Sequence, residues 1–243
     1  TTTRDVLVTV TGANDTPEIT VETGDTIEHG FNETDAALST SGTLTLTDLD
    51  LTDKTGSTVV RVEASGSGAG LSGQPSYGDL MAMFVTKGNE LDGTQTTGKI
   101  DWTFDSGSAT FDYLADGEEL VLKYTVRAND DNNITDPKTG EISASNEQVI
   151  TITITGTNDK PTLTGASDVQ YSVTEDVTTA PTTEADIITG RVTDADVSDK
   201  LSVTKVNGTE VKTANTDING TYGKLVISPD GKYYYELDNS NGN

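Results

Sequence analysis

Short runs in which apolar and polar residues alternate recur along the whole chain, separated by segments rich in Gly, Asp and Asn. Such alternation indicates half-buried β-strands, because successive side chains of a strand point to opposite faces of its sheet. Val, Ile and Thr dominate these runs, as is typical of strands. Strands are first predicted at residues 4–12, 18–22, 42–47, 57–63, 99–104, 108–113, 119–128 and 147–155. Further strands are predicted at residues 170–174, 187–193, 201–206, 223–228 and 232–237.

Residues 77–84 are the one place with helical character. A two-turn helix there would place Leu80, Met83 and Phe84 on one face. We expect that face to pack against the core of a sandwich. A long polar loop is predicted from Asn129 to Pro137, where Asp and Asn residues cluster.

One sequence motif occurs twice, 144 positions apart. Residues 6–17 and residues 150–161 each form an alternating β-branched run that leads into Gly-x-Asn-Asp-x-Pro. A repeat of this kind marks an array of like modules. We therefore predict an all-β chain of tandem sandwiches: the terminal strand of a preceding repeat at 1–13, a β-sandwich with a short helical insertion at 14–157, and a second sandwich, incomplete at its C-terminus, at 158–243.

The composition narrows the range of partners. The formal net charge is −25, from 15 basic and 40 acidic residues, and there is no cysteine. This charge disfavours nucleic acid and anionic membranes and favours cations. Disulfides and thiolate metal sites are excluded. No apolar run approaches the ~18–20 residues of a membrane span, and no leader begins the chain, so we expect a non-membrane piece of a longer exported polypeptide.

Catalytic chemistry finds no support in the sequence. The sole histidine, His29, lies in a polar stretch and is expected in a solvent-facing loop. Acidic residues are so numerous that no pair of carboxylates stands out as a general acid and base. No glycine-rich phosphate loop follows a strand and opens a helix. We therefore expect that the protein is not an enzyme.

Oxygen-bearing side chains gather where the two sandwiches are predicted to join. A hard divalent cation such as Ca²⁺ takes six to eight oxygen ligands from carboxylates, amide carbonyls and backbone. The second junction offers such a set, namely Asn158, Asp159, Glu175, Asp194 and Asp196. Asp199 lies three residues after Asp196. Each Asp also has a purely structural explanation, because Asn-Asp and Asp-x-Asp form turns by bonding their own backbone.

Several ordered motifs resemble the VCBS repeats of very large bacterial surface proteins. They include Gly-Thr-Leu-Thr-Leu-Thr-Asp-Leu-Asp at 42–50, with others at 80–84, 100–104, 111–118, 124–126, 154–161 and 223–241. The resemblance covers nearly the whole chain and implies immunoglobulin-like or cadherin-like modules of an RTX-type adhesin. Such proteins leave Gram-negative cells by type I secretion, and their repeats act as extenders at the cell surface that support adhesion and biofilm formation.

The same resemblance implies ligands at both junctions. Cadherin junctions share calcium ions among an Asn-Asp linker, an Asp-x-Asp loop and an Ala-x-Asp hairpin, which Ala128 to Asp130 matches. Carried over, the first junction comprises Asn14, Asp15, Asp48, Asp50 and Asp130. The second comprises Asn158, Asp159, Asp194 and Asp196, with Glu22 or Glu118 as a glutamate from the first module. Calcium and neighbouring repeats of the same polypeptide are then the expected partners.

Two other functions remain open. A carbohydrate- or ligand-binding sandwich would need a concave aromatic face, for which the exposed rings among Tyr233 to Tyr235 are candidates, whereas Trp102 is expected in the core. A filament subunit would self-associate head to tail if residues 5–11 completed the open second module of a neighbouring copy.

Overall fold

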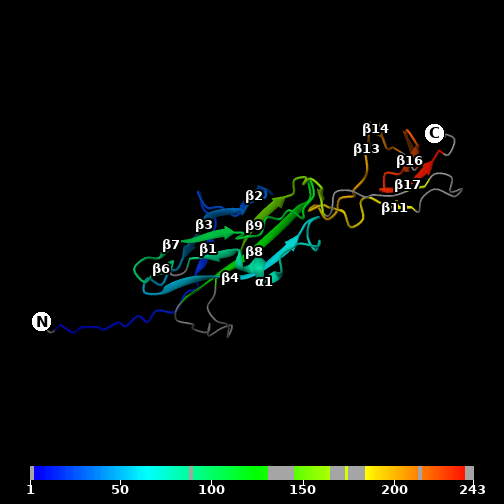
Figure 1. Ribbon diagram of the computed structural model, residues 1–243. Coiled ribbons are helices and arrows are strands. Elements are labelled where there is room, and N and C mark those ends of the chain that lie inside the picture. The colour runs from blue at the N-terminus through cyan, green and yellow to red at the C-terminus, as the bar shows by residue number, and fades with distance from the viewer. Residues whose placement is uncertain are drawn as a thin grey trace. The chain divides into compact units, whose positions relative to one another are not determined.

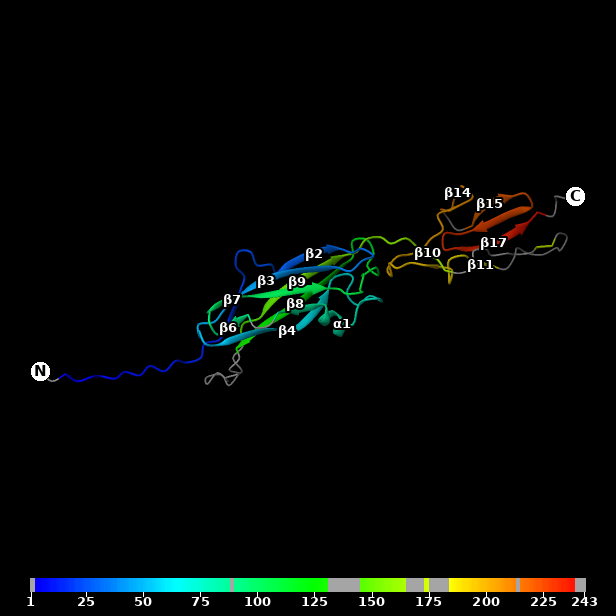
Figure 2. The same cartoon turned by 60° about the vertical axis from the view of Figure 1, so that its left-hand side comes forward.

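The computed structural model describes residues 3–87, 90–130, 145–164, 173–174, 184–212 and 215–238. The chain divides into two compact units, Thr1–Thr157 and Asn158–Asn243, which are described separately. Both consist almost entirely of β-strands and loops, which confirms the all-β class (Figures 1 and 2). The one helix among the described residues, α1, is far too short to span a membrane.

Unit 1 is a sandwich of two sheets. The first has the order β1-β3-β7-β5, with bounds Glu18–Thr20, Ser39–Thr47, Thr97–Asp105 and Phe84–Thr86. The second has the order β2-β9-β8-β4-β6, with bounds Glu28–Asn32, Gln148–Thr155, Glu119–Asp130, Lys54–Ser65 and Leu91–Asp92. Neighbouring strands are antiparallel except β2 and β9, which run parallel.

The alternation in the sequence produces the core between these sheets. In β9, Ile150, Ile152 and Ile154 all point inward and are fully buried. On the facing sheet Trp102 is 1% exposed, and its indole nitrogen donates to the Thr26 carbonyl at 3.1 Å. Phe84 stacks on Trp102 with ring centroids 5.3 Å apart. The prediction that Trp102 belongs to the core is confirmed.

Helix α1, Tyr77–Ala82, covers part of this core as expected. Ser76 and Asp79 form a capping box, which satisfies backbone donors that the first turn leaves free. Leu80 is buried, and its carbonyl accepts a hydrogen bond from the Tyr124 hydroxyl at 2.9 Å. The helix is shorter than predicted, because Phe84 already begins β5.

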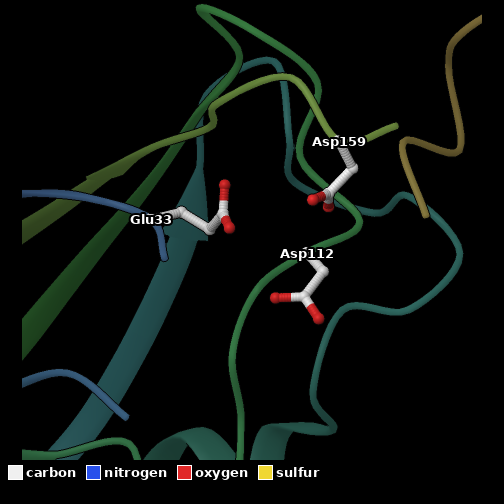
Figure 3. Close-up of side chains that lie close together, drawn as sticks. All are labelled: Glu33, Asp112 and Asp159. Carbon is white, nitrogen blue, oxygen red and sulfur yellow. The ribbon is translucent and has the colours of Figure 1, made fainter. Parts of the chain in front are cut away.

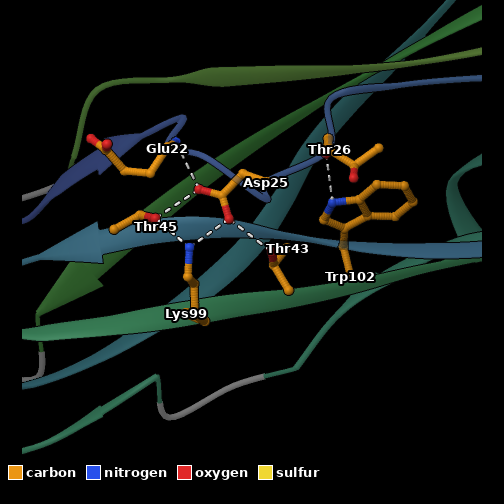
Figure 4. Close-up of polar contacts among 7 residues, drawn as sticks. All are labelled: Glu22, Asp25, Thr26, Thr43, Thr45, Lys99 and Trp102. Atoms are coloured by element: carbon orange, nitrogen blue, oxygen red, sulfur yellow. Dashed lines mark hydrogen bonds and ion pairs between the residues drawn. The ribbon is translucent and has the colours of Figure 1, made fainter.

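A buried polar network fastens the loop between β1 and β2 to the first sheet (Figure 4). The Asp25 carboxylate accepts hydrogen bonds from the Thr43 and Thr45 hydroxyls, both at 2.7 Å, and from Lys99 Nζ at 2.6 Å. The Glu22 amide donates to it at 2.9 Å. Burial alone would raise the pKa of Asp25, but these hydrogen bonds together hold it well below its ordinary range.

Unit 2 has shorter strands and a smaller core in its described part. One sheet has the order β11-β17-β16-β15, with bounds Ala185–Asp186, Lys232–Leu237, Gly223–Ile227 and Thr216–Gly220. Two strand pairs accompany it: β10 with β12, Thr162–Leu163 and Val192–Thr193, and β13 with β14, Lys205–Val206 and Thr209–Glu210. Val211, Ile218 and Ile227 form its buried cluster.

Several predicted strands are wrong or shortened. The strand predicted at 4–12, with nothing before it to pair with, pairs with no strand among the described residues, so that prediction is untested. Residues 108–113 instead form a turn in which Phe111 has a φ of 66°. Of 187–193 and 201–206 only the last two residues of each are strand, since Asp186 side-chain bonds form a turn before β12. The strand at 170–174 falls mostly outside the described residues. The pattern did not predict β2, β5, β6, β10, β11, β14 or β15.

Candidate metal sites in unit 1

The strand register gathers carboxylates at the end of unit 1 where β3 and β8 end and β4 begins. Asp48 directly follows β3, and Asp130 is the last residue of β8. Asp130 lies opposite Thr55 of β4 in the antiparallel ladder. Asp50 and Asp53 belong to the loop between β3 and β4. Residues far apart in sequence are therefore brought to one edge of the sandwich.

The segment before β1 is tied to this cluster by hydrogen bonds. The Asp15 amide donates to Asp50 Oδ2 at 2.6 Å, and Asn14 Nδ2 donates to Asp130 Oδ2 at 3.0 Å. The Asp50 amide in turn donates to Asp48 Oδ1 at 3.0 Å. All five residues predicted for the first junction thus lie in one connected group, whose members are Asn14, Asp15, Asp48, Asp50 and Asp130.

Two carboxylate oxygens of this group are buried without a hydrogen-bond partner. They are Asp48 Oδ2 and Asp130 Oδ1, on residues that are 2% and 6% exposed, and the buried Thr55 hydroxyl is unpartnered as well. An unsatisfied buried acceptor costs roughly 1–3 kcal/mol, and more when it is charged. A divalent cation is the ligand that would satisfy several such oxygens at once.

The electrostatics of the cluster favour the same ligand. Burial raises the pKa of Asp48, and the charges of Asp50, Asp53 and Asp130 raise it further, against a lowering by the Asp50 amide hydrogen bond. Removing charge from this group, by a proton or a bound cation, is therefore favourable. Asp53 is 7% exposed and was missed by the sequence prediction.

Unit 2 repeats the hydrogen bonds of the first linker and loop. The Asp159 amide donates to Asp196 Oδ2 at 2.8 Å, as Asp15 does to Asp50. The Asp196 amide donates to Asp194 Oδ1 at 3.3 Å, and Asn158 Nδ2 donates to the Asp159 carbonyl at 2.5 Å. The described strands of unit 2 include no counterpart of β8, which carries Asp130 in unit 1. Glu175 lies outside the described residues.

A second acidic pair lies at the opposite end of unit 1 (Figure 3). Glu33 follows β2, and Asp112 lies in the loop between β7 and β8. Their carboxylates approach within 4.8 Å, Glu33 is 2% exposed, and Asp112 Oδ1 is buried without a hydrogen-bond partner. Figure 3 also draws Asp159, the second residue of unit 2.

Local backbone structure positions both members of this pair. Parallel pairing of β2 with β9 brings Glu33 to residue 157, and Glu33 Oε2 accepts from the Thr157 amide at 2.9 Å and hydroxyl at 3.0 Å. Asp112 follows Phe111, whose positive φ is strained for a residue with a side chain. Such strain is often found at functional positions.

The sequence prediction did not find Glu33 or Asp112. It named Glu22 or Glu118 as the glutamate that the first module contributes to the second junction. The Glu22 amide donates to Asp25, and Glu118 Oε2 accepts from the Ala115 amide at 3.1 Å; the role of these two carboxylates as ligands stays a prediction. His29 was expected in a solvent-facing loop. Instead it lies in β2, half-buried, 4.4 Å from the Phe31 ring and 3.3 Å from the Thr40 hydroxyl.

Comparisons with known proteins add only distant structural likeness. No family model and no curated protein matches the sequence. Among solved structures, the seventh PapD-like domain of human CEP192 is 13% identical with a TM-score of 0.34, covering 64% of this chain and 96% of that domain. The CooA pilin subunit of enterotoxigenic Escherichia coli is 11% identical with a TM-score of 0.28, covering 60% of this chain and 100% of the pilin. Both TM-scores are too low to carry an argument about function.

Proposed function

We propose that the chain is a structural extender segment of a secreted bacterial cell-surface adhesin, in which Ca²⁺ binds at the junctions between tandem β-sandwich modules and stiffens them. The observation that carries the proposal is the pair of buried, unpartnered carboxylate oxygens on Asp48 and Asp130. The charges of Asp50 and Asp53 act on the same group. The described structure gives neither of the two buried oxygens a hydrogen-bond donor.

Repetition of the linker geometry supports a role at junctions. The hydrogen bond from Asp15 to Asp50 recurs between Asp159 and Asp196, 144 and 146 positions further along the chain. In both copies the motif Gly-x-Asn-Asp-x-Pro follows a β-branched run, and an Asp-x-Asp sequence lies more than 30 residues further on. A turn that only reversed the chain would not require a second carboxylate from more than 30 residues away.

The stiffening follows from how the ligands are distributed. Glu33 and Asp112 belong to unit 1, and Glu33 holds Thr157 by two hydrogen bonds. An ion held by Glu33 and Asp112, beside the backbone of Thr157, would restrict the backbone dihedrals at the end of unit 1. Without the ion, the like charges repel and the linker bends more freely.

Calcium titration of the intact chain tests the binding step. Isothermal titration should give a dissociation constant on the order of 0.1–1 mM, the range of extracellular calcium modules. Combining Asp48→Asn with Asp130→Asn should weaken the first site at least about tenfold, because two formal charges are lost. The matched control Asp35→Asn, at an exposed position, should bind as the parent does. Absence of heat and of any melting shift at about 5 mM calcium would remove the metal from the proposal.

Small-angle scattering tests the stiffening step separately. Calcium should narrow the distribution of maximum dimensions relative to chelator, because fewer linker conformations remain. Glu33→Gln with Asp112→Asn should abolish that narrowing while leaving calcium binding at the Asp48 cluster intact. An identical scattering profile with and without calcium would leave an ion-binding sandwich that does not act as a stiffened extender.

A further inference from the structure

Residues 4–12 carry exposed apolar side chains at alternate positions. Val6, Val8 and Val10 are 86%, 75% and 87% exposed. The segment, at the blue end of the chain in Figure 1, pairs with no strand of the described structure. An alternating β-branched run with both backbone edges unpaired exposes hydrogen-bonding groups and apolar surface together, which favours pairing with another strand.

The second copy of the same motif shows what surrounds it when it is paired. Positions 6, 8 and 10 correspond to Ile150, Ile152 and Ile154 of β9, all fully buried. In that copy β9 lies between β8, to which it is antiparallel, and β2, to which it is parallel. The apolar positions therefore match one for one, in two opposite environments.

The glycine of the motif shows the same contrast. A Cβ on Gly156 would lie 2.3 Å from the carbonyl oxygens of both Leu114 and Ala115, so the turn before β8 admits only glycine there. A Cβ on Gly12 would have nothing within 4 Å. Gly12 does not have a positive φ, so its backbone conformation does not require glycine either. Close packing explains the glycine in one copy, and nothing in the described structure explains it in the other.

We infer that residues 4–12 are the last strand of a further sandwich of the unit 1 kind in the same polypeptide, inserted between its β8-type and β2-type strands with Gly12 against its β7–β8 turn. The inference rests on the tandem-module part of the proposed function and is independent of calcium. It specifies the partner as a module with an open slot flanked by one antiparallel and one parallel strand.

Grafting tests whether this segment fits such a slot, using β9 of the intact chain as the host. The graft places the sequence of residues 4–11 at 148–155 through Gln148→Arg, Val149→Asp, Ile150→Val, Thr151→Leu, Ile152→Val and Ile154→Val. Unit 1 should still unfold cooperatively, with Tm lowered by roughly 5–15 °C for three lost methylene groups. The matched control uses the same graft with Ser at 150, 152 and 154, and it should lose the transition.

Two outcomes would overturn the inference. One is a valine graft that loses its transition as the serine control does, because the segment would then not fit a β9-type slot. The other is a mass above 25.5 kDa that grows with concentration in light scattering and returns to the monomer value with Val8→Arg. A second copy of the chain would then take the strand. All these measurements are made in chelator, so failure of the calcium titration leaves them unaffected.

Discussion

Asp25→Asn should destabilise unit 1 substantially, although the substitution leaves the number of heavy atoms in the side chain unchanged. The carboxylate has no exposed surface and receives hydrogen bonds from two threonine hydroxyls, one backbone amide and Lys99. An asparagine would turn an NH₂ group toward some of these donors and would leave Lys99 without its counter-charge.

The magnitude follows from the exposure of the two partners. Breaking a buried charge pair costs about 3–5 kcal/mol, and the Lys99 side chain is 46% exposed, so water compensates part of its loss. We therefore expect a loss of about 3 kcal/mol. For a unit of this size each kcal/mol moves Tm by about 2–4 °C, so Tm should fall by roughly 6–12 °C.

Fluorescence of Trp102 is the suitable assay, because it is the single tryptophan of the chain and lies in the core of unit 1. Melts in chelator would compare the parent, Asp25→Asn and the exposed control Asp35→Asn. The folded state lowers the pKa of Asp25 below its ordinary 3.8, so its carboxylate stabilises the fold above that value and less as pH falls through it. The Tm gap should thus be constant from pH 7 to about pH 5 and shrink below about pH 4.

A gap of less than about 2 °C at pH 7 would refute this reasoning, since it would mean that the network exchanges for water at no cost. A gap that persists unchanged to about pH 2 would contradict the electrostatic part alone and leave a packing effect.

Three further predictions concern other parts of unit 1. Gly156→Ala should cost about 2–3 kcal/mol in a thermal melt, because its Cβ meets two backbone carbonyls, whereas Gly12→Ala should be neutral in this chain. Glu90→Gln should increase the free energy of unfolding by about 1 kcal/mol at pH 7–8 and so raise Tm. The reason is that Glu90 Oε2 is buried without a partner and burial raises the Glu90 pKa. The gain should vanish as pH falls through the raised pKa, and its persistence there would contradict the assignment. In chelator, Asp48→Asn should reduce the rise in Tm as the pH falls from 7 toward the raised pKa of Asp48, because burial raises that pKa and the charged form opposes folding. Equal slopes of Tm against pH for parent and variant would disprove this.

The sequence predicted correctly those elements whose own apolar spacing identifies them. In β7 and β9, strict alternation identified the strands and their inward faces, and Trp102 was placed correctly between Ile100 and Phe104. The helix at Tyr77 was visible because its apolar spacing changes there. In unit 2 the same pattern overestimated strands, because side-chain bonds from Asp186 stabilise a turn that alternation does not reveal.

Residues joined only by tertiary pairing were harder to predict. Strand β2 contains Glu28, His29 and Asn32 and reads as polar, yet it pairs with β9 more than 110 residues away. Glu33 reaches residue 157 only through that pairing, so no spacing in the sequence could reveal it. Asp53, in contrast, could have been predicted from the sequence, because it follows Asp50 by three residues just as Asp199 follows Asp196. In the structure the Asp53 amide donates to the Asp50 carbonyl, and the Asp199 amide donates to the Asp196 carbonyl.

The parallel pairing of β2 with β9 determines how unit 1 resists tension. One strand comes early in the unit and the other ends it, and five register pairs join them from Glu28 with Thr151 to Asn32 with Thr155. When the two chain ends are pulled apart, parallel neighbours slide past one another, so their hydrogen bonds bear the load in shear and must break together. An antiparallel pair pulled from one end would instead open bond by bond, under much less force.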